Sequence, residues 1–292
     1  APGTSDINLT TTSGPRYFGS VDIDNFGSRY AGSDRIGITA GVNSLTGHGD
    51  QLTIRGQTTG TNRMQQGSQT NYGRIAYLVP IGSDGFKLGA AYSAMQYQLG
   101  LNYQNTATNG TANTASLFGT YPFVRSRNLN LYGQAGYDNL TMTNNSFGFE
   151  ISNKTVNNGN LGVSGNSRDD FMGGGLNTFG ATATMGNLSL KNSNGYSDLD
   201  ALTAQTAGSF QRYNFNFSRL QAITSGMHFV FNASAQMASK NLDSSQQFYL
   251  GGPSGVRAYP VGQGAGSQGA VLQLELHQQL LTSSPVGAIS AY

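Results

Sequence analysis

Charged residues are scarce in this sequence of 292 residues. Asp, Glu, Lys and Arg together make up 10% of it, and the formal net charge is +2. A soluble domain usually carries about 25% charged residues. Ser, Thr, Asn, Gln and 41 glycines supply the polarity instead. The protein surface is therefore either unusual or not facing water, and the near-neutral charge gives no reason to expect a nucleic-acid partner.

Cysteine is absent, which excludes a disulfide framework, a thiolate metal site and a cysteine nucleophile. Long apolar runs are absent as well, because no segment approaches the roughly 18 apolar residues of a transmembrane helix. The first residues show no basic segment followed by an apolar one, so we expect the mature part of an exported protein or an internal fragment. A membrane location stays open, since a barrel strand needs only about 10 residues with every second one apolar.

What the sequence does contain is an alternation of apolar and polar residues along its whole length. Tyr213, Phe215 and Phe217 occupy every second position of one stretch, with Arg and Asn beside them. Near the end, Glu275 and His277 alternate with leucines in the same way. Successive side chains of a strand point to opposite faces of its sheet. Each such segment therefore predicts a strand with one apolar face and one wet face.

These segments predict an all-β fold, a transmembrane antiparallel β-barrel that forms one domain over residues 1–292. We expect thirteen strands near 16–25, 33–45, 49–58, 71–81, 86–98, 115–124, 127–142, 153–166, 169–187, 208–222, 226–240, 270–281 and 286–292. A soluble β-sandwich or β-solenoid is the alternative, but its strands average five or six residues. Connections are short at 82–85 and 224–226 and long at 59–70, 99–114, 188–207 and 241–269. Such alternation is typical of outer-membrane barrels, with turns in the periplasm and loops outside.

The segment 248–264 is rich in Gly and Pro and contains a single arginine, Arg257. A glycine-rich phosphate loop would need a following Lys-Ser/Thr, which is missing. A guanidinium folded into a barrel lumen would need a carboxylate for its five donors. An arginine in an exposed outer loop would contribute little. The composition of the segment does not decide between an arginine folded into the lumen and an arginine in an exposed outer loop.

A family resemblance favours the first reading. Residues 250–260 read Leu-Gly-Gly-Pro-Ser-Gly-Val-Arg-Ala-Tyr-Pro, which resembles the sixth extracellular loop of two-partner secretion transporters (TpsB, the haemolysin secretion/activation type of the POTRA-barrel superfamily). Segments 24–30, 131–134 and 238–245 are also typical of that family. The motif residues expected to anchor the loop are Gly251, Gly252, Pro253, Gly255, Val256, Arg257, Ala258, Tyr259 and Pro260.

The resemblance implies a monomeric barrel of sixteen strands in the bacterial outer membrane, in contact with lipid and lipopolysaccharide. It implies that the sixth loop enters the lumen, where Arg257 meets an aspartate of strand 13 expected just beyond Tyr292. The chain would then be a C-terminal barrel domain that lacks its last strands, with POTRA domains upstream. Its partner would be a secreted exoprotein such as a haemolysin, an adhesin or a contact-dependent toxin.

Three other functions were weighed. Insertases of the same superfamily carry a shorter Val-Arg-Gly-Tyr/Phe core, and a plain porin would not need the arginine block. An enzyme would have to use His48, His228 or His277, which are scattered and have no evident carboxylate partner for catalysis. Three scattered histidines do not make a metal site either. We therefore expect no catalytic residues, no metal and no cofactor.

Overall fold

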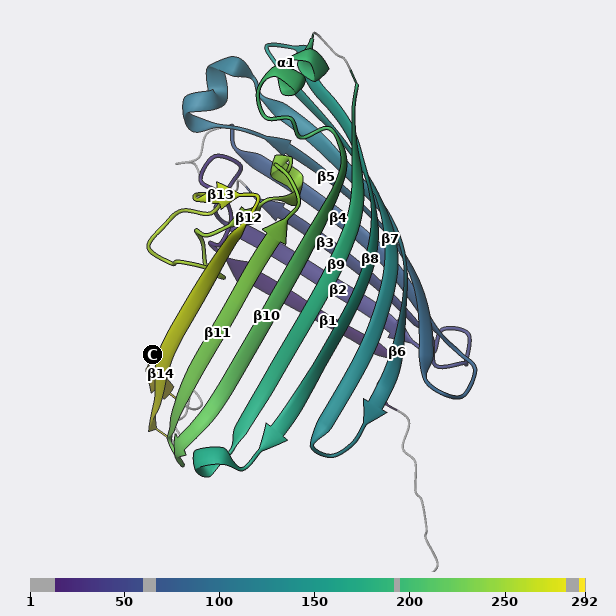
Figure 1. Cartoon of the computed structure of the whole chain (residues 1–292), viewed down its shortest axis with the longest axis vertical. Helices are drawn as coiled ribbons and strands as arrows, with labels where there is room; N and C mark the ends of the chain where they lie inside the picture. The colour runs from purple at the N-terminus through teal and green to yellow at the C-terminus, as the bar shows by residue number, and fades with distance from the viewer. Residues whose placement is uncertain (1–13, 60–66, 192–194, 282–288, 292) are drawn as a thin grey trace, which may run out of the picture.

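The computed structural model describes residues 14–59, 67–191, 195–281 and 289–291 of the chain. Their main feature is a 13-stranded sheet in which each strand pairs antiparallel with the next along the chain (Figure 1). The strands are β1 (Tyr17–Asp24), β2 (Arg35–Asn43), β3 (Gln51–Thr59), β4 (Gln69–Ile81), β5 (Phe86–Gln98), β6 (Asn109–Arg125), β7 (Leu129–Ser146), β8 (Phe149–Asp169), β9 (Gly175–Lys191), β10 (Gly208–Thr224), β11 (Met227–Ala238), β14 (Gly269–Leu281) and β15 (Ile289–Ala291). A separate two-stranded sheet, β12 (Phe248–Tyr249) with β13 (Ala265–Gly266), lies within the connection from β11 to β14.

The alternation in sequence becomes two chemically different faces of this sheet. Val21 and Ile23 of β1 are 65% and 78% exposed, as suits side chains that meet lipid. On the opposite face, Asp24 accepts a hydrogen bond from Arg35 Nε at 2.6 Å, and Asp22 accepts one from Arg55 Nη2 at 3.0 Å. The ion pairs of β1 to β3 thus lie on the inner face of the sheet, opposite the apolar side chains of β1.

The two ends of the sheet differ in the connections they carry. Short turns join the strands at one end, among them residues 82–85, 126–128 and 225–226. The other end carries the longer connections, including the 3-10 helix η2 (Leu101–Thr106), the helix α1 (Tyr196–Leu202) and the β12–β13 sheet (Figure 1). Within the described part of the chain, no helix is long and apolar enough to cross a membrane. The predicted arrangement of turns and loops is therefore present.

One predicted connection is wrong. The sequence suggested a link between residues 142 and 153, but β7 and β8 run on to Ser146 and from Phe149. They are joined by Phe147 and Gly148, whose φ angles are 52° and 79°. Positive φ at both central residues is the geometry of a tight hairpin turn that matches strand twist. The strands were underestimated because Asn and Ser replace the alternating apolar residues there.

Two predicted strand starts are also wrong. β6 begins at Asn109 rather than 115, and β9 begins at Gly175 rather than 169. Before β9, the Asp169 side chain accepts a hydrogen bond from the Phe171 backbone N–H at 3.1 Å, which favours a turn. Gly173 and Gly174 then adopt φ angles of 97° and 103°. Of the predicted last strand, 286–288 and 292 lie outside the described residues.

Candidate functional site: the loop between β11 and β14

The connection 239–268 begins with a stem, residues 239–247, in which Leu242, Asp243 and Gln246 are buried against the inner face of the sheet. Leu242 is 2% exposed and belongs to a cluster with Val156 of β8, Leu188 of β9 and Phe210 of β10. These apolar side chains occupy positions where the inner face is otherwise polar. They therefore form a small hydrophobic core whose lid is the loop stem.

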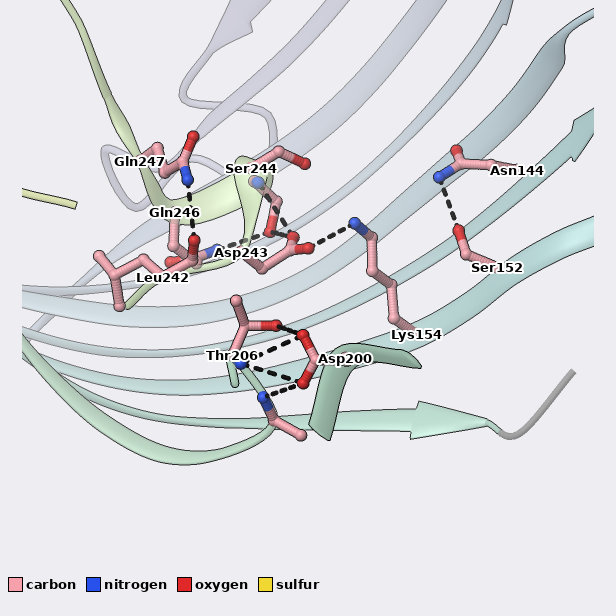
Figure 2. A network of polar contacts seen from close by, with 12 residues as sticks. Asn144, Ser152, Lys154, Asp200, Thr206, Leu242, Asp243, Ser244, Gln246 and Gln247 are labelled. Atoms are coloured by element: carbon pink, nitrogen blue, oxygen red, sulfur yellow. Dashed lines mark hydrogen bonds and ion pairs between the residues drawn. The ribbon is translucent and has the colours of Figure 1, made fainter. Parts of the chain in front are cut away.

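A buried ion pair holds the next residue of the stem (Figure 2). Lys154 Nζ of β8 donates to Asp243 Oδ2 at 2.7 Å, and the two side chains are 5% and 7% exposed. Asp243 also accepts hydrogen bonds from the backbone N–H and hydroxyl of Ser245, at 3.0 and 2.7 Å. Burial tends to raise the pKa of Asp243, but the charge and hydrogen bond of Lys154 together with Ser245 hold this pKa below its ordinary value. Asp243 is thus the charged partner of the buried lysine.

Gln246 extends this attachment to two more strands, β10 and β11, and adds a second contact to β8. Its side-chain oxygen accepts from Arg212 Nη1 of β10 at 2.9 Å and from Asn158 Nδ2 of β8 at 3.4 Å. Its backbone carbonyl accepts from Gln236 Nε2 of β11 at 3.0 Å. The side chains of Gln246 and Gln236 are both buried. The stem is therefore fixed by contacts to β8, β10 and β11 at once.

The connection between β9 and β10 lies against the same stem. Lys240 Nζ donates to the Ala207 carbonyl at 2.5 Å, and Asn241 Nδ2 donates to the Ala204 carbonyl at 3.0 Å. Asp200 of α1 organises this neighbour by accepting hydrogen bonds from the backbone and hydroxyl of Thr206 (Figure 2). Burial tends to raise the pKa of Asp200, but these bonds keep it below its ordinary value. No pattern in the sequence predicted α1, which lies in the connection predicted at 188–207.

Beyond β12, the tip of the loop, residues 250–264, folds into tight turns that require its glycines. A Cβ on Gly255 would come within 2.1 Å of the Leu250 carbonyl oxygen, and one on Gly251 within 2.3 Å of the Pro260 carbonyl oxygen. Gly252 adopts a φ of 116°, where side chains are strained. Val256 N–H donates to the Leu250 carbonyl at 2.7 Å. The Gly-Gly-Pro part of the motif therefore builds the turn that presents the arginine.

Arg257 reaches the polar face of β14. Its Nη2 donates to Glu275 Oε1 at 2.5 Å, and Gln273 Nε2 of the same strand donates to the Gly255 carbonyl at 2.5 Å. The other oxygen of Glu275 lies 2.8 Å from His277 Nε2. Arg257 is 55% exposed, in contrast to the buried Lys154. The aspartate that the resemblance implies beyond Tyr292 lies outside this sequence, and within it Glu275 is the carboxylate that contacts the arginine.

The remaining motif residues do not gather around Arg257 as a closed site. Val256 and Tyr259 are exposed, and Ala258 and Pro260 are exposed as well. Tyr259 and Pro253 line a cavity of about 680 Å³. Its opposite wall is the β1–β2 connection. The structure thus brings the glycines, Val256 and Arg257 into one folded tip. The Tyr259 side chain faces the cavity between this tip and the β1–β2 connection.

The three histidines are placed differently from one another. His48 lies in the turn before β3, with Nδ1 3.2 Å from the Thr46 hydroxyl. His228 and His277 are opposite each other on β11 and β14. Among the residues that the structure describes, no three His, Asp or Glu side chains are grouped as metal ligands.

Comparison with known proteins identifies the family. The sequence model of the family described as "Haemolysin secretion/activation protein ShlB/FhaC/HecB" matches residues 3–292. The chain belongs to this family. Proteins similar to this member of the ShlB/FhaC/HecB family include the heme/hemopexin transporter protein HuxB of Haemophilus influenzae, 25% identical over 285 residues that cover 95% of this chain and 48% of that protein. The outer membrane transporter CdiB of Dickeya dadantii is 23% identical over 95% of this chain and 49% of its own length.

Solved structures agree on the fold of this ShlB/FhaC/HecB member. CdiB from Escherichia coli superposes with a TM-score of 0.80 at 18% identity, over 97% of this chain and 52% of that one. The predicted family, the antiparallel transmembrane β-barrel and the bacterial outer-membrane location are confirmed. The chain spans about half the length of the curated relatives it matches.

Proposed function

We propose that this chain forms the pore of an outer-membrane transporter that secretes a large exoprotein, and that residues 239–268 are its sixth outer loop, folded into the lumen. The observation that carries this proposal is the contact of Arg257 with Glu275, because it joins the loop tip to the polar face of β14. The family match and the transporter names of HuxB and CdiB support export. The family match also favours export over an insertase or a plain porin.

The two attachments of the loop differ in the free energy needed to break them, as expected for a gate with one part that moves and one part that stays in place. The ion pair of the tip is partly exposed, with Arg257 at 55% and Glu275 at 18%, and such a pair contributes only about 0–1 kcal/mol. With the hydrogen bond from Gln273 to the Gly255 carbonyl, which contributes about 0.5–1.5 kcal/mol, the tip still separates from β14 at a smaller cost than the stem. Removing one partner of a buried pair costs about 3–5 kcal/mol, so Lys154 and Asp243 keep the stem in place. During export, the tip would leave the lumen while the stem stays attached to β8.

The substitution Arg257→Ala tests this function in the complete protein, by measuring exoprotein in the medium. We expect secretion to fall and Glu275→Gln to lower it similarly, since both remove the same contact. The double exchange Arg257→Glu with Glu275→Arg should restore part of the secretion.

Arg168→Ala serves as the matched control, because Arg168 is an exposed arginine at the short-turn end of β8, far from the loop. Secretion unchanged by Arg257→Ala would remove the arginine from the mechanism. An equal loss in Arg168→Ala would show that the assay reports barrel assembly instead.

A further inference from the structure

The surface of β7 to β10 carries a hollow lined by neutral polar side chains. Its volume is about 580 Å³, and it includes Gly159 of β8 and Met185 of β9, which face each other in the sheet. Its polar lining consists of three amides, two hydroxyls and a phenol: Asn157, Asn187, Gln211, Ser209, Ser239 and Tyr137. Among the residues that the structure describes, no charged side chain lines it. We call this feature the polar hollow.

Strand alternation places these polar side chains on the outer face of the barrel. Asn157 lies between Val156 and Asn158, which are buried inside, where Val156 packs on the loop stem and Asn158 donates to it. Asn187 precedes Leu188, which belongs to the same inner core. Successive side chains of a strand point to opposite faces. The polar hollow therefore opens away from the lumen.

A second polar group on the same face lies toward the short turns. Arg219, at the next outward position of β10 after Phe217, donates from Nη1 to Asp169 Oδ2 at 2.7 Å. Between the two polar groups, residues 159–167 of β8 present outward side chains such as Leu161, which is 64% exposed. A tilted barrel strand needs about 9–11 residues to cross the bilayer. The polar hollow thus lies at the headgroup level of the outer leaflet, on the side of the long loops.

An apolar hollow of about 900 Å³ continues from the polar hollow toward the short turns. Tyr137 lines both of them. Tyr213, which lines the apolar hollow, donates from its hydroxyl to Gln211 Oε1 of the polar hollow at 3.0 Å. Small residues, among them Ala135 and Ala183, line the apolar hollow alongside large apolar ones. One face of the barrel therefore joins an apolar groove to a neutral polar end.

The chemistry of the polar hollow suits sugar hydroxyls. Among its described neighbours, Asn187 makes one side-chain hydrogen bond, from Nδ2 to Ser209 Oγ at 3.1 Å. An amide has two donors and one acceptor oxygen, so Asn187 keeps both functions for a ligand that donates and accepts. Tyr137 is 52% exposed and offers an apolar ring with a polar tip. A phosphate would instead call for guanidinium or ammonium groups, which the lining lacks.

We propose that this face binds a glycolipid of the outer leaflet, such as lipopolysaccharide, with sugar hydroxyls in the polar hollow and an acyl chain in the apolar hollow. Tyr137 contacts both parts of the ligand, because it lines both hollows. The site faces the membrane and is independent of the export of any partner.

The first test fills the polar hollow. A Cβ on Gly159 would lie 3.8 Å from the Met185 carbonyl oxygen, so the backbone accepts a side chain there. The complete protein and its Gly159→Phe variant are equilibrated in vesicles of phosphatidylethanolamine, phosphatidylglycerol and rough lipopolysaccharide. They are then transferred to a detergent without a sugar headgroup and weighed by native mass spectrometry. We expect retained lipopolysaccharide, and a loss of about tenfold or more in the retained fraction for Gly159→Phe.

Gly73→Phe is the matched control for this variant. It adds the same ring to the outward face of β4, where no described atom lies within 4 Å of a Cβ, and it should retain lipopolysaccharide as the unchanged protein does. An equal loss in Gly73→Phe and Gly159→Phe would overturn the proposal. Migration of the folded barrel on unheated gels confirms that each variant folds.

The second test removes the polar groups without filling the hollow. Asn187→Leu combined with Gln211→Leu should abolish the preference for lipopolysaccharide over phospholipid. Asn71→Leu combined with Gln96→Leu makes the same changes at an exposed pair of β4 and β5, and it should keep the preference. A phospholipid retained equally well by the unchanged protein would overturn the proposal. So would equal binding of the free oligosaccharide of the same lipopolysaccharide, because the acyl chain would then contribute nothing.

Discussion

The stem and the tip of the loop between β11 and β14 are each held by an ion pair to the inner face of the barrel, but the two pairs differ in burial. The stem pair, Lys154 with Asp243, is almost completely shielded from water, whereas Arg257 of the tip pair is 55% exposed. Solvent screens an exposed pair strongly and a buried pair weakly. One loop therefore combines a permanent attachment with a releasable one.

The largest expected effect comes from Lys154→Met. This change leaves the Asp243 carboxylate buried without its cation, and we expect a loss of about 3–5 kcal/mol in the free energy of unfolding. Urea unfolding of the barrel in lipid vesicles measures it. Adding Asp243→Leu should recover most of the loss, because an apolar pair replaces the charged one. No recovery in the double variant would contradict the assignment of the cost to an unpaired charge.

Leu242→Ala should cost somewhat less, about 3 kcal/mol, because it opens a cavity beside Val156 and Phe210. The same unfolding assay measures this loss. Leu272→Ala is the control, since Leu272 is 70% exposed on the outer face. In vesicles, the Leu272→Ala variant should lose only the contacts between the Leu272 side chain and lipid. A larger effect at Leu272 would show that the stem core does not hold the loop.

Acid should weaken the stem selectively. The pKa of Asp243 is lowered from 3.8 by folding, so its contribution to stability is complete above that value and is lost as the pH falls through the lowered pKa. The stability advantage of the unchanged protein over the double variant Lys154→Met with Asp243→Leu, which lacks the titrating carboxylate, should stay constant from about pH 8 to about pH 5 and shrink below about pH 4. An advantage that already falls between pH 8 and 5 would point to another titrating group.

Arg257→Gln should have the smallest effect on stability, about 0–1 kcal/mol, because Arg257 is largely exposed. Its effect on secretion should be far larger than its effect on unfolding. The stem variant Lys154→Met should do the reverse, with a large loss in the free energy of unfolding and a small loss in secretion. Measuring both quantities in both variants therefore distinguishes the tip attachment from the stem attachment. An Arg257→Gln loss as large as that of Lys154→Met would make the tip a structural attachment.

Much of this arrangement could be read from the sequence. Alternating residues such as Tyr213, Phe215 and Phe217 predicted β10, because the outer face of the sheet requires apolar side chains and the inner face requires polar ones. The turn at Phe147 and Gly148 escaped prediction, since a phenylalanine with a φ of 52° is rare and residues 143–146 before the turn are polar on both faces. Local pattern carries no information about such a turn.

The partners of the loop were harder to predict than its motif. The sequence indicated that Arg257 needs a carboxylate and placed Glu275 on a polar strand face, but only the folded tip shows that the two meet. Lys154 and Asp243 are 89 residues apart, and neither has a local feature that marks it as buried. Long-range pairs of this kind depend on how the stem crosses the sheet. The alternation of apolar and polar residues along a strand contains no information about that crossing.

The most direct test of the two attachments uses the absence of cysteine from these 292 residues. Cysteine pairs are introduced at the stem (Lys154→Cys with Asp243→Cys) and at the tip (Arg257→Cys with Glu275→Cys), and each is bridged by a reducible bifunctional thiol reagent in the complete protein. Secreted exoprotein is then measured before and after reduction. We predict that the bridged tip blocks secretion until it is reduced, when secretion returns to the lower level of Arg257→Ala, whereas the bridged stem does not block it. Secretion that continues through a bridged tip, or that stops with a bridged stem, would contradict the account.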